Sequence, residues 1–130
     1  MNTVEERIVI VNKIINEISL KGRNFFRGKM GTAYFFQKGN KLYMKNSYSG
    51  EMMCINTENN SKPKGWTNGG TLWGLVKDFK EFIQKGGDTN HNNGYGGLYC
   101  THWGYSEQEM YDIQNYAFEL GYLKQKSQKQ

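Results

Sequence analysis

The segment TLWGLVKDFKEFIQK, residues 71–85, decides the fold class because its apolar residues recur at helical spacing. Their i, i+3, i+4, i+7 pattern places them on one side of a helix, and that side must be buried against other elements. A basic residue and two glycines, Lys85-Gly86-Gly87, end the predicted helix. The apolar side consists of Leu72, Leu75, Val76, Phe79, Phe82 and Ile83.

A first helix is predicted from about residue 4 to residue 20. Thr3 and Glu6 have the spacing of a capping box, in which each side chain accepts a hydrogen bond from the other residue's backbone N–H. Lys21 and Gly22 are typical of a helix end. The apolar stripe of this helix consists of Ile8, Ile10, Val11, Ile14, Ile15 and Ile18.

A third helix is predicted to begin after Ser106, because Ser106 and Glu109 form a second capping-box pattern and Tyr105 and Met110 can form a hydrophobic staple. Gly121 is expected to end it. Its inner stripe consists of Met110, Ile113, Ala117 and Leu120. The basic tail, residues 124–130, is expected to be frayed, which leaves residues 1–123 as a single α+β domain.

Three short strands are predicted between the first two helices. Thr32–Phe36 and Lys41–Asn46 are rich in strand-forming residues and flank a turn at Lys38-Gly39-Asn40. A third strand at about Glu51–Asn56 follows a turn at Ser49-Gly50. The order is therefore α-β-β-β-α-α, which predicts an α+β fold with a small antiparallel sheet of about three strands packed against three helices.

Composition indicates an ordered, soluble, cytoplasmic domain. The chain has 130 residues, a formal net charge of +5 and 15% aromatic residues, and it contains no apolar run of membrane-spanning length. We therefore expect no membrane partner. The two cysteines, Cys54 and Cys100, show no spaced framework, so reduced thiols are expected. The positive charge favours anionic partners.

The candidate ligand site is built around residues 86–105, GGDTNHNNGYGGLYCTHWGY, which combine glycines with aromatic rings. Glycine lets backbone approach a ligand closely, and Tyr and Trp supply flat faces with a polar tip. Two helix starts, after Trp66 and after Tyr105, offer backbone N–H groups to an anion. The candidate ligand-binding residues are Arg23, Arg27, Trp66, Asn68, Gly69, Gly70, Thr71, Tyr95, Gly96, Gly97, Tyr99, His102 and Trp103.

Each type of residue in this set has an expected role. The tyrosine and tryptophan rings would stack on a base, and the glycines would offer N–H groups to phosphate. Arg23 and Arg27 would neutralise charge, and His102 would donate a directional hydrogen bond.

An enzymatic or metal site is the first alternative. Cys100, His102 and His91 could form a thiolate–imidazole pair or bind zinc. No CxxC pair and no paired carboxylates accompany them, so we expect binding without catalysis and assign no catalytic residue, metal or cofactor.

Nucleic-acid binding is the second alternative. A basic hairpin that interleaves aromatic rings with lysines is typical of a surface that stacks bases and follows phosphates. The competing expectation is that the aromatic side of the sheet faces the helices and forms the core. The residues concerned are Arg23, Arg27, Tyr34, Phe36, Lys38, Lys41, Tyr43 and Lys45. A third alternative, an inhibitor of a host protein, would instead present an exposed apolar patch.

Three segments resemble small, uncharacterised proteins encoded by phages, prophages and mobile elements. They are KLYMKN (41–46), NGGTLWGLVKDF (68–79) and NNGYGGLYCTHWGY (92–105), and the resemblance extends over roughly residues 20 to 123. It implies action in the host cytoplasm, and small phage proteins of this size often act against host defences. One such strategy is a sponge that sequesters a nucleotide-derived immune signal without cleaving it.

The main functional hypothesis from the sequence is therefore a non-enzymatic, phage-type binding protein that captures an anionic, nucleotide-like small molecule. Homo-oligomerisation is expected, because a short chain can deepen a pocket by sharing it across a two-fold axis.

Overall fold

The computed structural model describes residues 3–21, 26–56, 62–64, 66, 70–86, 98 and 106–123. In these ranges three helices and five strands follow in the order α-β-β-β-β-β-α-α, and the predicted α+β class is confirmed. The helices are α1 (Val4–Ser19), α2 (Gly70–Lys85) and α3 (Glu107–Leu120). The strands are β1 (Arg27–Gly28), β2 (Gly31–Thr32), β3 (Phe35–Lys38), β4 (Lys41–Lys45) and β5 (Met52–Cys54).

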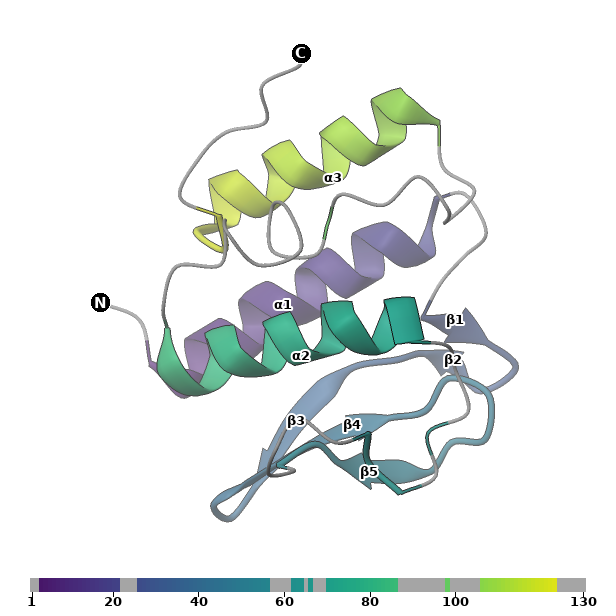
Figure 1. Ribbon diagram of the computed structural model, residues 1–130, viewed down its shortest axis with the longest axis vertical. Coiled ribbons are helices and arrows are strands. Elements are labelled where there is room, and N and C mark those ends of the chain that lie inside the picture. The colour runs from purple at the N-terminus through teal and green to yellow at the C-terminus, as the bar shows by residue number, and fades with distance from the viewer. Residues whose placement is uncertain are drawn as a thin grey trace.

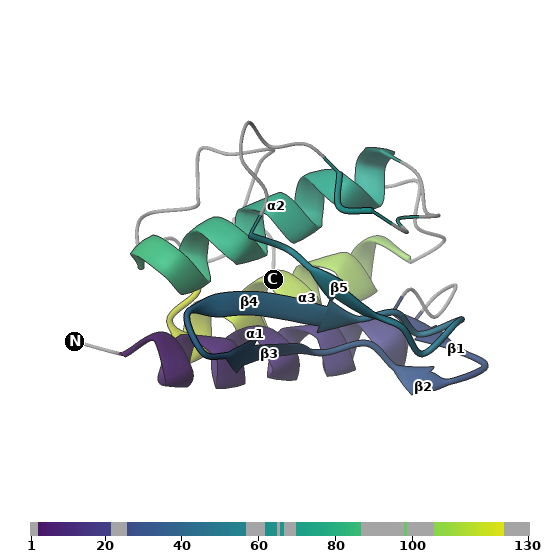
Figure 2. The same ribbon diagram turned by 90° about the horizontal axis from the view of Figure 1, so that it is seen from below.

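The helices all lie on one side of the sheet, in two layers. Helix α1 packs against α2, α3 and β3. Figure 1 shows α1 and α2 between the sheet and α3, and Figure 2, viewed from below, shows the strands in front of the helices. The side of the sheet that faces away from the helices is therefore the side turned toward the viewer in Figure 2.

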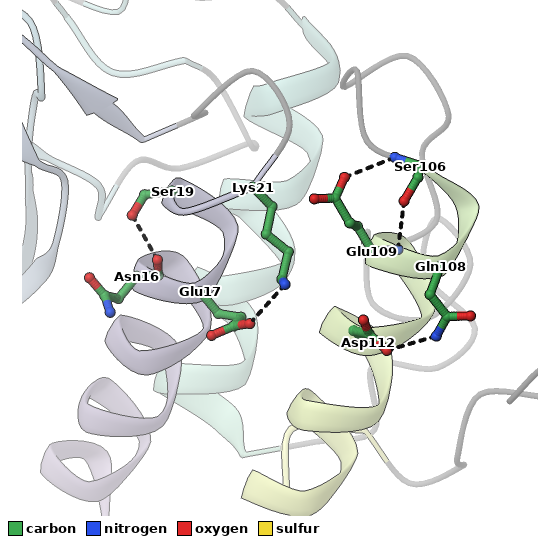
Figure 3. A network of polar contacts seen from close by, with 8 residues as sticks. All are labelled: Asn16, Glu17, Ser19, Lys21, Ser106, Gln108, Glu109 and Asp112. Carbon is green, nitrogen blue, oxygen red and sulfur yellow. Dashed lines mark hydrogen bonds and ion pairs between the residues drawn. The ribbon is translucent and has the colours of Figure 1, made fainter.

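Both predicted capping boxes are present. The Thr3 hydroxyl accepts a hydrogen bond from the Glu6 backbone N–H at 3.1 Å, and the Glu6 carboxylate accepts one from the Thr3 N–H at 2.7 Å. Ser106 and Glu109 repeat this arrangement at the start of α3, beside the last turn of α1 (Figure 3). Gly121 adopts a φ of 95° at the end of α3, a left-handed conformation that glycine reaches without strain.

The sheet is a meander of β3, β4 and β5, in which Phe35 pairs with Met44 and Met44 with Met53. The predicted boundary of its first strand is wrong. The strand begins at Phe35, and Thr32 pairs instead with Arg27 in a separate two-stranded hairpin of β1 and β2. Strands of two residues are too short to show alternation, so the sequence pattern merged β2 with β3.

The outer edge of β3 is covered by a side chain of α1. The Asn12 carboxamide donates a hydrogen bond to the Phe35 carbonyl at 3.0 Å and accepts one from the Phe35 N–H at 2.7 Å. An edge strand otherwise presents unpaired backbone groups to solvent. Asn12 therefore fixes both the position of β3 on α1 and the side of the strand that faces the core.

The core fills the space between the sheet and the helices. All six residues of the predicted α2 stripe are buried, with exposed fractions of 7% or less. The Phe79 ring contacts the rings of Phe35 at 6.3 Å, Phe26 at 6.4 Å and Tyr122 at 5.4 Å between centroids. Phe79 of α2 therefore contacts both the sheet and the segment that follows α3.

Candidate nucleic-acid interface

Residues of β3, β4 and β5 alternate between two faces of the sheet. The inner face points at the helices, and its residues Phe35, Leu42, Met44, Met53 and Ile55 are each 3% exposed or less. The outer face carries the intervening positions, and directly paired residues such as Phe36, Tyr43 and Cys54 share it. Lys45 pairs with Met52, and the Lys45 backbone N–H donates a hydrogen bond to the Tyr34 carbonyl. These three residues therefore also belong to the outer face.

Three aromatic rings form a continuous strip on the outer face. The Phe36 and Tyr43 rings lie 5.5 Å apart between centroids with their planes 14° from parallel. Tyr34 continues the strip at 5.9 Å from Phe36, and the Lys45 ammonium lies 5.7 Å from the centre of the Tyr34 ring. Tyr34 is 38% exposed. One face of the sheet, which carries Phe35, forms part of the core as expected, and these three rings lie on the other face because they occupy the alternate positions.

The charge of the strand region is strongly positive. Residues 26–56 contain one acidic residue, Glu51, and five basic ones: Arg27, Lys29, Lys38, Lys41 and Lys45. Helix α3, on the far side of α1 and α2 from the sheet (Figure 1), carries the opposite charge through Glu107, Glu109, Asp112 and Glu119, with no Lys or Arg. This separation of charge favours approach of an anionic partner to the sheet.

Two lysines are placed directly opposite each other. Lys38 pairs with Lys41 across the β3–β4 turn, and both are exposed. Like charges at directly paired positions of a sheet are destabilising. A bound anion between these side chains would remove that repulsion.

The structure describes four of the predicted ligand-binding residues. Arg27 is exposed on β1, and Gly70 and Thr71 form the first turn of α2 at the predicted position. The Trp66 ring lies edge-on to Trp73 at 5.3 Å, and its indole nitrogen is buried without a hydrogen-bond partner. The other predicted ligand-binding residues lie outside the described ranges: Arg23, Asn68, Gly69, Tyr95, Gly96, Gly97, Tyr99, His102 and Trp103.

Leu98 is the one residue of the predicted 86–105 loop that is described beyond its first position. It is 1% exposed and belongs to the core, and its carbonyl accepts a hydrogen bond from the Gln114 carboxamide at 3.2 Å. Gln114 is completely buried on the inner side of α3. This contact was not predicted from the sequence, although a glutamine one turn after Met110 on an apolar stripe is a signal for a buried polar contact.

The described ranges bear on metal binding and on membrane insertion. No group of three His, Cys, Asp or Glu side chains there is placed to hold a metal ion. No helix in the same ranges combines the length and the hydropathy of a membrane-spanning segment. His91, Cys100 and His102 lie outside these ranges, so the enzymatic and metal alternatives stay untested.

Fold and surface together define a small α+β protein whose three-stranded sheet turns a basic, aromatic face away from its helices. The chain belongs to the YoqU family, whose model matches residues 2–129. It is similar to the SPbeta prophage-derived uncharacterized protein YoqU of Bacillus subtilis (strain 168), with 27% identity over 119 residues that cover 91% of this chain and 83% of that protein. Comparison with solved structures gives no significant match. The expected resemblance to prophage-encoded proteins is confirmed, and the anti-defence role stays a prediction.

Proposed function

We propose that this protein binds single-stranded nucleic acid on the outer face of its β3–β4–β5 sheet. The observation that supports this most directly is the strip of outward-facing rings, Tyr34, Phe36 and Tyr43, bordered by lysines. Sheet surfaces that stack bases on aromatic rings and hold phosphates with basic side chains are a recurrent solution for single strands.

The ring spacing determines how bases would stack. Stacked bases lie about 3.4 Å apart, so a base between two rings needs a separation of about 7 Å. Phe36 and Tyr43 are closer, at 5.5 Å. Bases therefore stack on the free outer surfaces of this pair and of Tyr34, while phosphates contact Lys38, Lys41 and Lys45. An open face of this kind suits an extended strand better than a small molecule, which requires a concave site.

The test measures binding of fluorescently labelled single-stranded DNA and RNA by anisotropy at several salt concentrations. Affinity is expected to fall as salt rises, because each neutralised phosphate releases counterions. The double variant Phe36→Ala/Tyr43→Ala is expected to weaken binding by about 1–3 kcal/mol for each base that loses its ring.

Phe118→Ala is the matched control. Phe118 is an exposed aromatic residue on the acidic helix α3, and its exposed fraction of 37% is close to the 38% of Tyr34. Its removal should leave affinity unchanged. Absence of salt-dependent binding by the unchanged protein, or equal losses in the sheet and α3 variants, would contradict the proposal.

Capture of an anionic, nucleotide-like small molecule is a second candidate function. It is favoured by Trp66, whose buried indole N–H has no partner and lies on the chain just before α2. An unpaired buried donor costs stability, and a ligand acceptor would satisfy it. Native mass spectrometry of protein from defence-active and defence-free cells should find a carried small molecule only in the former, and Trp66→Phe should reduce its occupancy. Protein that carries no small molecule from either source would exclude this candidate.

A further inference from the structure

A cleft of about 220 Å³ lies where the β3–β4 turn meets the start of α1 and the end of α2, on the opposite end of the sheet from the β1–β2 hairpin (Figure 1). Among the described residues, its lining contains no charged side chain. Three lining residues are apolar, namely Val4, Leu42 and Ile83. The other four carry carboxamides: Gln37, Asn40, Asn56 and Gln84.

Two of these carboxamides are held in a defined orientation. The Asn56 oxygen Oδ1 accepts hydrogen bonds from the Leu42 backbone N–H and from Gln84 Nε2, both at 2.9 Å. This leaves the Asn56 amino group as a donor and the Gln84 oxygen as an acceptor. Among the described residues neither group has a protein partner, so two residues that line the cleft supply one donor and one acceptor for a ligand.

We propose that this cleft binds a nucleobase, with adenine as the best match. A carboxamide pairs in bidentate fashion with the adjacent donor and acceptor of an adenine edge, N6 and N7. An enclosed cavity of about 150 Å³ holds a benzene ring, and drug-sized ligands occupy about 300 Å³ or more. The cleft is therefore large enough for one heterocycle, whose faces the apolar lining residues contact.

The neutral lining separates this site from the outer face of the sheet. The described lining residues supply no cation for a phosphate, so the ligand proposed for this cleft is an uncharged nucleoside. Lys38 and Lys41 flank the turn that carries Asn40, on the opposite face of the sheet. Binding in the cleft therefore does not depend on the ring strip or on the proposed binding of single strands.

The test is a titration with adenosine, monitored through the side-chain amide signals in ¹H–¹⁵N NMR spectra. The signals of Asn56 and Gln84 are expected to shift in a saturable manner. Asn56→Asp keeps both accepted hydrogen bonds, because a carboxylate can accept them, but it removes the amino donor. This variant is expected to bind adenosine at least about tenfold more weakly.

Three further variants make the result specific. Gln84→Met removes the acceptor at an exposed position and is expected to weaken binding similarly. Gln108→Glu makes the same amide-to-carboxylate change on α3, outside the cleft, and should have no effect. Phe36→Ala/Tyr43→Ala should retain adenosine binding. No saturable shift at millimolar adenosine, or a loss in the sheet variant but not in Asn56→Asp, would overturn the inference.

Discussion

The two faces of the sheet are formed by the same strands and by similar residues, but one face is buried against the helices and the other faces away from them. Phe35 and Phe36 are neighbours, yet Phe35 is 1% exposed under α2 while Phe36 is half-buried on the outer face beside Tyr43. The inner face is purely apolar where it meets the helices, and the outer face mixes rings with lysines. Aromatic residues in a strand therefore do not by themselves indicate a core, and the charged residues beside them are the better guide.

The largest expected effect on stability comes from a pair of alanine variants, each of which removes one ring from one face of the sheet. Phe35→Ala removes a ring that packs edge-on against Phe79 and should destabilise the fold by about 3–5 kcal/mol. Phe36→Ala should cost about 1 kcal/mol or less, the energy of a cross-strand pair. Urea unfolding followed by circular dichroism measures both. Equal losses would show that the outer rings are structural.

A smaller loss of stability is expected when Asn12, which holds the edge of β3 on α1, is replaced. Asn12→Ala leaves the Phe35 N–H and carbonyl without their partner and should destabilise the protein by about 1–3 kcal/mol. Asn16→Ala, an exposed position one turn later on α1, is the matched control and should be nearly neutral. A neutral Asn12→Ala would mean that core packing alone positions the strand.

The smallest expected effect concerns the paired lysines of the outer face. Lys38→Gln removes the repulsion from Lys41 and should raise the free energy of unfolding by about 0.2–1 kcal/mol. The same change should reduce the slope of log affinity against log salt by about 0.7 for a single strand, because one phosphate contact is lost. A variant with lower stability and an unchanged salt slope would place Lys38 outside the binding surface.

Local patterns predicted most of the fold. The helices, both capping boxes and the Gly39-Asn40 turn depend on residues a few positions apart, and each was correctly placed. The β1–β2 hairpin was missed because its strands are too short to show a period. Of the candidate site residues, Gly70 and Thr71 lie at the predicted start of α2, whereas the cleft between Asn56 and Gln84 had no signal in the sequence.

The sequence by itself determined which segments are helical, where they begin and that the strands have two distinct faces. The lysines at positions 38, 41 and 45 indicate the outward face, but the sequence could not determine which helices cover the opposite face or how they pack on it. That was decided by contacts between distant residues, such as Asn12 with Phe35, 23 positions apart, and Gln84 with Asn56, 28 apart. Hydrogen bonds of this kind depend on how the helices pack on the sheet, so only the tertiary structure determines the position of β3 on α1 and the cleft.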